Sequence, residues 1–91
     1  MTVTSSTYRR GGVLVPKDPA IVAFGKRLRA LRHGAAMSQV QLARAAGVHD
    51  TYIGQIERGE RNLSLRNVLR LAHGLEVAPG ALVDHLEISE P

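Results

Sequence analysis

The spacing of apolar residues predicts five helices after an irregular start. From residue 20 onward, apolar side chains recur every three or four positions, and charged residues occupy many of the positions between them. Glycines and a proline divide this pattern, because glycine often ends a helix and proline often opens one. The expected helices cover residues 20–34, 39–46, 50–58 and 65–74, and a last one begins at Pro79.

The second of these segments has the clearest boundary signals. Ser38 and Gln41 have the spacing of a capping box, in which each side chain bonds the backbone amide of the other residue. Gly47 is placed to end the helix in a left-handed conformation. Ser64 is likewise a candidate N-cap for the fourth segment. The buried face of the second segment is predicted to consist of Val40, Leu42, Ala43 and Ala46.

The chain before the helical region is predicted to be an arm. The Gly11–Gly12 pair and two prolines prevent a helix from running through residues 1–19, so we expect a flexible, solvated arm there and one domain over residues 20–88. Two alternatives stay open for this arm. Val13–Val15 is a candidate short strand, and Arg9 with Arg10 forms a basic pair that suits a DNA minor groove.

Composition agrees with a small helical domain and excludes several classes of protein. The 91 residues suffice for one domain, and only 3% of them are aromatic. The chain has no cysteine, which excludes disulfides, thiol catalysis and a Cys-ligated metal. Its four histidines lack a metal-binding spacing, and no apolar run approaches the roughly 18–20 residues of a membrane span. We therefore expect a cytoplasmic protein without a metal or cofactor.

The charge distribution favours a polyanionic partner. Lys and Arg together number 12 against 8 Asp and Glu, and most of the cations are arginine. All of the cations lie at or before Arg70, whereas the end of the chain carries Glu76, Asp84, Glu87 and Glu90. Arginine suits planar contacts to phosphate and guanine. The basic body of the chain therefore indicates nucleic acid as a partner.

Two short helices joined by a turn at Gly47–His49, inside a basic five-helix domain, meet the geometric requirement of a helix-turn-helix. The chain also contains the motifs F-G-K-R-L-R-A-L-R, M-S-Q-V-Q-L-A-R-A-A-G-V, Y-I-G-Q-I-E-R-G-E-R-N-L-S-L and L-A-H-G-L-E-V-A-P-G-A-L. In these motifs, residues 24–86 resemble the phage repressor/Cro family, the Xre-type helix-turn-helix proteins. The segment from Thr51 to Leu65 is especially similar to restriction–modification controller proteins. The resemblance implies an all-α, five-helix, lambda-repressor-like DNA-binding fold.

The resemblance also implies roles for individual residues. The positions that read bases are held by Asp50, Thr51 and Gln55. The positions that contact the DNA backbone are held by Gln39, Tyr52, Arg58, Arg61 and Asn62. Arg32 and Glu57 match an ion pair that fixes the reading helix. His49 stands where the family prefers Ser or Thr as a cap, so Asp50 is either a substitute cap or an acceptor for a cytosine amino group.

These features predict a transcriptional regulator that reads a pseudo-palindromic operator in the major groove as a homodimer. A dimer is expected because one small module contacts too few base pairs for useful specificity. Its candidate interface residues are Leu75, Val77, Leu82, Val83 and Leu86. The alternative is a protein-interaction module, such as the antitoxin of a toxin–antitoxin pair. Neither an enzyme nor a small-molecule site is expected, since no catalytic pair or phosphate-binding loop can be assembled.

Overall fold

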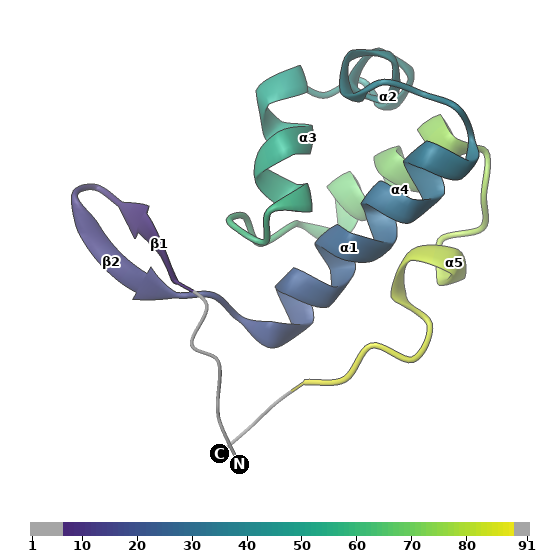
Figure 1. The fold of residues 1–91 in the computed structure, drawn as a ribbon. Helices are drawn as coiled ribbons and strands as arrows, with labels where there is room; N and C mark the ends of the chain where they lie inside the picture. The colour runs from purple at the N-terminus through teal and green to yellow at the C-terminus, as the bar shows by residue number, and fades with distance from the viewer. Residues whose placement is uncertain (1–6, 89–91) are drawn as a thin grey trace.

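A computed structural model describes residues 7–88 and contains a short hairpin followed by five helices (Figure 1). The helical domain predicted from the sequence is therefore confirmed. The strands are β1 (Thr7–Arg10) and β2 (Val13–Pro16). The helices are α1 (Pro19–Gly34), α2 (Gln39–Ala46), α3 (Asp50–Glu57), α4 (Leu65–Leu75) and α5 (Gly80–Val83).

One apolar core joins all five helices. α2 packs against both α3 and α4, and α1 packs against α3 and α5. Every helix contributes at least one fully buried side chain, and the largest of these are Leu28, Leu42, Ile53, Ile56, Leu71 and Leu82. Burial of a Leu or Ile side chain stabilises a fold by roughly 1.5–3 kcal/mol, so this set supplies much of the driving force for folding.

The boundaries of α2 follow the local signals in the sequence. The Ser38 hydroxyl accepts a hydrogen bond from the Gln41 amide at 3.0 Å, and the Gln41 side chain accepts one from the Ser38 amide at 2.7 Å. Gly47 ends the helix with a φ of 74°. The predicted buried face is confirmed at Leu42, Ala43 and Ala46 and wrong at Val40, which is 41% exposed.

Gly74 does not end α4, although the sequence predicted that it would. The helix continues through Leu75, and Glu76 forms the left-handed cap with a φ of 57°. A Cβ atom at Gly74 would lie 2.9 Å from the backbone nitrogen of Ala46 in α2. The glycine therefore allows α4 to pack closely against α2. The sequence pattern alone does not distinguish a glycine needed for such packing from one that ends a helix.

The segment before α1 forms a hairpin where the sequence predicted a flexible arm. β1 and β2 pair in antiparallel register, with Arg10 opposite Val13 at the turn. Gly11 and Gly12 both have positive φ, 57° and 80°, which is the geometry of a two-residue type I′ turn. The strand considered at Val13–Val15 is thus present, and the hairpin projects from the start of α1 (Figure 1). Residues 1–6 of the predicted arm lie outside the described residues.

The end of the domain changes the set of residues available for a dimer interface. Leu75 and Leu82 belong to the core of the monomer, and Val77 and Leu86 pack against that core. Of the five candidates, Val83 is the large hydrophobic residue that stays exposed, at 43%. The sequence could not separate these cases, because α5 is a single turn whose contacts depend on α1 and α4. Exposed apolar side chains on α4 are Leu65 and Leu69.

Candidate nucleic-acid interface

The sequence places α2 and α3 across a three-residue turn, and burial decides which side of α3 faces outward. Val48 in the turn packs against the core, and Ile53 and Ile56 of α3 are fully buried. Asp50 and Thr51 lie on the exposed side, and Gln55 is partly exposed. With side chains, an α-helix is about 10–12 Å wide, which matches the major groove of roughly 12 Å.

The start of α3 is capped by two neighbouring side chains. The Thr51 amide donates to Nδ1 of His49 at 3.2 Å and to Oδ1 of Asp50 at 2.9 Å. His49 occupies the N-cap position, so its imidazole nitrogen does the work of a Ser or Thr oxygen. The Asp50 carboxylate also lies 3.0 Å from the His49 ring. One oxygen of Asp50 therefore takes part in capping.

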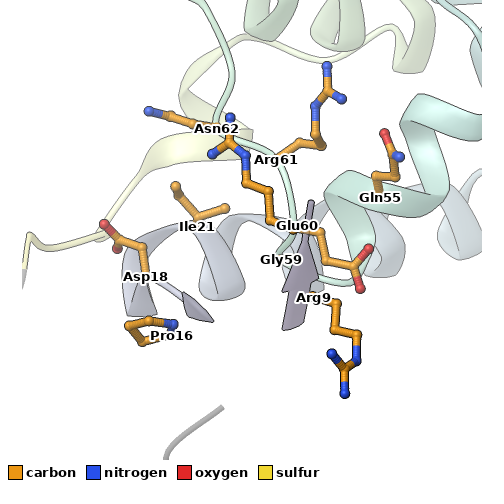
Figure 2. Close-up of a pocket in the computed structure, with 10 residues that line it drawn as sticks. Arg9, Pro16, Asp18, Ile21, Gln55, Gly59, Glu60, Arg61 and Asn62 are labelled. Atoms are coloured by element: carbon orange, nitrogen blue, oxygen red, sulfur yellow. The ribbon is translucent and has the colours of Figure 1, made fainter. Parts of the chain in front are cut away.

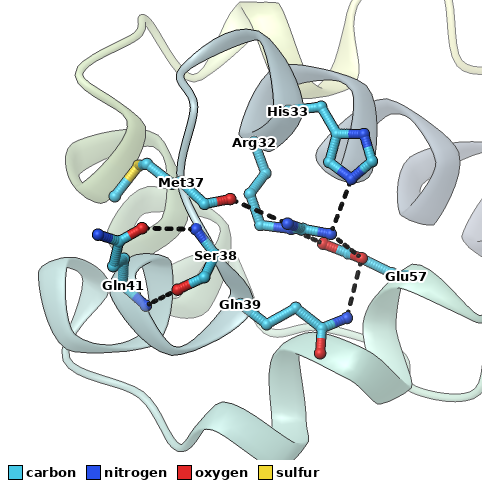
Figure 3. Close-up of polar contacts among 7 residues, drawn as sticks. All are labelled: Arg32, His33, Met37, Ser38, Gln39, Gln41 and Glu57. Atoms are coloured by element: carbon cyan, nitrogen blue, oxygen red, sulfur yellow. Dashed lines mark hydrogen bonds and ion pairs between the residues drawn. The ribbon is translucent and has the colours of Figure 1, made fainter.

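A buried ion pair joins α1 to the end of α3 (Figure 3). Arg32 donates from Nε to Oε2 of Glu57 at 2.6 Å and from Nη2 to Oε1 at 2.9 Å. Its Nη1 donates to the carbonyl oxygen of Met37 at 2.9 Å, so the guanidinium also holds the α1–α2 connection. The two side chains are only 9% and 4% exposed. A planar, two-point contact of this kind fixes the angle between the helices.

The Glu57 carboxylate is held in its charged form. Burial pushes its pKa upward, but hydrogen bonds from Arg32 and Gln39 and the charges of Arg32 and Arg29 outweigh burial, so the pKa lies below its ordinary value. The hydrogen bond to Glu57 raises the pKa of Arg32, against the effect of burial. Both groups are therefore charged at neutral pH, and each neutralises the other inside the protein.

Gln39 and Arg58 come together beside the first turn of α2. Gln39 donates from Nε2 to Oε1 of Glu57 at 3.1 Å, which ties this side chain to the buried ion pair (Figure 3). A Cβ atom at Gly54 would lie 3.1 Å from Nη1 of Arg58 and 3.6 Å from Oε1 of Gln39. Both side chains thus lie over the bare backbone of Gly54. Arg58 also pairs with Glu60 at 3.2 Å, a contact that the sequence did not predict.

Tyr52 and Arg61 form a second group on the other side of α3. The guanidinium of Arg61 lies 5.3 Å from the centre of the Tyr52 ring, within the range of a cation–π contact. Asn67 of α4 donates to the Tyr52 hydroxyl at 3.1 Å and so helps to hold the ring in place. Asn67 carries no signal in the sequence that would mark this role, because its partner lies 15 residues away in another helix.

A cleft of about 550 Å³ lies beside the C-terminal half of α3 and the loop that follows it (Figure 2). Gln55, Arg61 and Asn62 line it from α3 and the loop that follows. Arg9 and Arg10 of β1 line it from the hairpin. Three of the residues expected to contact DNA are therefore neighbours of the two hairpin arginines, although those arginines are more than 40 residues away in sequence.

Within residues 7–88, the structure has no helix with the length and apolar character needed to cross a membrane. In the same part of the chain, no three His, Asp or Glu side chains gather closely enough to hold a metal ion. Polar and cationic residues instead surround α3, which is joined to α2 by a three-residue turn. This arrangement is that of a DNA-binding helix-turn-helix protein.

Comparison with known proteins leads to the same class. The sequence model of a protein family, described as a helix-turn-helix domain, matches residues 23–86, and the chain belongs to this family. The control protein C.BamHI of Bacillus amyloliquefaciens is 42% identical over 66 residues, which cover 71% of this chain and 82% of that protein. The chain is accordingly a DNA-binding regulator of transcription and not an enzyme.

Solved structures of restriction–modification controller proteins are similar to the structure of this chain. C.AhdI from Aeromonas hydrophila is 47% identical with a TM-score of 0.67, covering 68% of this chain and 94% of that one. Wild-type C.Esp1396I is 27% identical with a TM-score of 0.71, covering 77% of this chain and 92% of that one. The similarity to controller proteins expected from residues 51–65 is therefore confirmed.

Proposed function

We propose that this protein binds a pseudo-palindromic operator as a homodimer, with α3 in the major groove, and controls transcription as restriction–modification controller proteins do. The observation that carries the proposal is the division of α3 into two faces. Ile53 and Ile56 are buried, while Asp50 and Thr51 are exposed and Gln55 is partly exposed. Because DNA lies in the cytoplasm of a bacterial cell, we propose that compartment as the place of action.

In this proposal Gln55 and Thr51 read bases. The Gln55 amide can form two hydrogen bonds with adenine, and the Thr51 methyl group can contact the methyl group of thymine. Asp50 shares the capping of α3, and its second oxygen is available to accept from a cytosine amino group. The Arg32–Glu57 pair does not touch DNA in this arrangement. It sets the angle at which α3 enters the groove.

The residues proposed to hold the DNA backbone lie on both sides of α3. Gln39 and Arg58 are grouped at the start of α2, where free backbone amides and the helix dipole favour a phosphate. Tyr52, Arg61 and Asn62 are grouped at the opposite side. Two separated groups of this kind would grip the two strands that border one major groove, and so fix the register of α3.

The homodimer is proposed because one copy of α3 reads only a few base pairs. A two-fold axis would place two reading helices about 34–36 Å apart, one turn of DNA, and double the sequence that is read. Leu65, Leu69 and Val83 are the exposed apolar side chains of α4 and α5 that a second copy could cover. Sedimentation analysis of the free protein tests this point, since a monomer at tens of micromolar would contradict it.

Selection from a randomised duplex pool tests operator recognition. We expect a two-fold symmetric site with half-sites about one helical turn apart, and affinity that falls steeply as salt increases. Enrichment of a single half-site would contradict the dimer. No enrichment, together with a stable heteromer purified from the native host, would favour an antitoxin-like protein partner instead.

Gln55→Ala separates base reading from simple attraction to DNA. We expect this variant to lose about 1–3 kcal/mol at one base position in each half-site, so that position becomes degenerate in a repeated selection. Arg58→Ala is the matched comparison. It should weaken binding to all sequences and lower the salt slope of the dimer by about two, because it removes one phosphate contact from each subunit. Equal behaviour of the two variants would contradict the base-reading role of Gln55.

A further inference from the structure

The hairpin carries a pair of arginines to the edge of the proposed DNA surface. Arg9 and Arg10 are exposed, and both line the cleft together with Gln55, Arg61 and Asn62. Figure 2 shows Arg9 among the residues that surround it. The hairpin lies before residue 23, where the match to the helix-turn-helix family begins. It is therefore an addition to the part of the chain that the family comparison explains.

The acidic residues of the cleft are already engaged. The Asp18 carboxylate caps α1 by accepting from the Ala20 amide at 2.8 Å. Glu60 accepts from Nε of Arg58 at 3.2 Å. The cleft is thus lined by three arginines and two carboxylates, and the charge of Glu60 is offset by Arg58 outside this set. The resulting excess of positive charge favours an anion between the hairpin and the α3–α4 loop.

The geometry of the hairpin limits how far its arginines can move from the cleft. The Gly11–Gly12 turn has the twist that two-residue hairpins require, so Arg9 and Arg10 sit on a paired strand. Arg9 also donates from Nη1 to the carbonyl oxygen of Gly12 at 3.4 Å. A cation held on a strand loses less conformational entropy on binding than one on a flexible tail.

We propose that the hairpin β1–β2 is a second DNA-binding element, and that the cleft receives the sugar–phosphate backbone next to the bases read by α3. This proposal rests on the proposed function, because Gln55 borders both the groove-facing side of α3 and the cleft. A duplex seated on α3 would continue past Gln55 into the cleft. There Arg9 and Arg10 would contact phosphates from one side, and Arg61 with Asn62 would contact them from the other.

The test compares two full-length double variants that remove the same charge. Arg9→Ala/Arg10→Ala removes the hairpin cations. Lys26→Ala/Arg70→Ala removes two exposed cations that do not line the cleft. Each protein is titrated with the duplex selected for the wild type across a salt series, and phosphate ethylation interference locates the phosphates that matter. Urea unfolding checks that both variants keep the stability of the wild type.

We expect the hairpin variant to bind roughly tenfold or more weakly at about 0.15 M salt. Its salt slope should be lower by about 3.6, since a bound dimer loses two phosphate contacts from each subunit and each contact contributes about 0.9. Ethylation of the phosphates beside the base positions read by Gln55 should interfere with the wild type and no longer with this variant. The base preferences of the selected site should stay unchanged. The control variant should keep the ethylation pattern of the wild type.

Two results would overturn the proposal while leaving the operator-binding function intact. In the first, the wild type binds its selected site and the two double variants have equal slopes and ethylation patterns, so the hairpin does not contact DNA. In the second, the hairpin variant loses preference for a base, which would assign base reading to the arginines. If the wild type selects no duplex, the proposed function itself fails, and the hairpin proposal fails with it.

Discussion

Two regions flank the reading helix α3, and they hold arginine in opposite ways. At the α1–α3 junction, Arg32 is buried and all of its contacts are within the protein. At the hairpin, Arg9 and Arg10 are exposed and face a cleft. A buried guanidinium fixes geometry because breaking its contacts leaves a charge without solvent, whereas an exposed one keeps its charge available for a partner. Arg32 therefore orients α3, whereas Arg9 and Arg10 are proposed to add attraction to DNA.

The largest effect is expected from breaking the buried pair. Arg32→Ala leaves the Glu57 carboxylate buried without its main partner, which should lower the free energy of unfolding by about 3–5 kcal/mol. Urea denaturation followed by circular dichroism measures this loss. Lys26→Ala, an exposed cation of the same helix, should change stability by less than about 0.5 kcal/mol. Equal losses for the two variants would show that the pair does not hold α3.

The close approach of α1 to the end of α3 is the next feature to break. A Cβ atom at Gly25 would clash with the carbonyl oxygen of Ile56 and would lie 2.9 Å from that of Glu57. Because both neighbours are backbone atoms, Gly25→Ala should destabilise the fold by about 1–3 kcal/mol. Gly34→Ala, where a Cβ meets nothing within 4 Å, should leave thermal stability unchanged or slightly raised. A neutral Gly25→Ala would mean that the helices can separate without cost.

The stability of the fold should also depend on pH through the buried Glu57 carboxylate. The pKa of Glu57 is lower in the folded protein than its ordinary value, so the folded state favours the carboxylate. Its contribution is fully present above the ordinary carboxyl pKa of about 4.3, and is lost as pH falls through the lower folded value. Urea midpoints measured between about pH 6 and pH 2 should fall more for the wild type than for Glu57→Gln. Parallel curves would contradict this role of Glu57.

The smallest effect on stability is expected at the hairpin. Replacing Gly11 and Gly12 together by alanine strains two positions with positive φ and should open the β1–β2 turn. The free energy of global unfolding should change by less than about 0.5 kcal/mol, because the buried apolar core among the side chains that the structure describes is formed by α1–α5. Amide chemical shifts of residues 7–16 should move while those of α1–α4 stay constant. A large loss of stability would show that the hairpin supports the helical core.

Much of the helical domain could be predicted because its signals are local. The Ser38–Gln41 capping box and the left-handed Gly47 act over a few residues, so the sequence specified α2 almost to the residue. The outward position of Asp50 and Thr51 followed from the burial of Ile53 and Ile56 at helical spacing. The choice of base-reading and backbone-contacting residues needed the family resemblance as well, since many exposed polar residues look alike in a single sequence.

The remaining features depended on contacts between distant segments. In the sequence, Gly74 looks like a glycine that ends a helix. Only its proximity to Ala46 shows that it allows α4 to pack closely against α2. Contacts between distant segments also decide three other features. These are the partner of Tyr52, the placement of the hairpin beside the α3–α4 loop, and the burial of Leu75 and Leu82. Periodicity and capping determined which segments are helices, because these effects act within one or two turns. Only the tertiary structure decided which faces meet and which arginines stay exposed, because close packing and desolvation act between residues far apart in the chain.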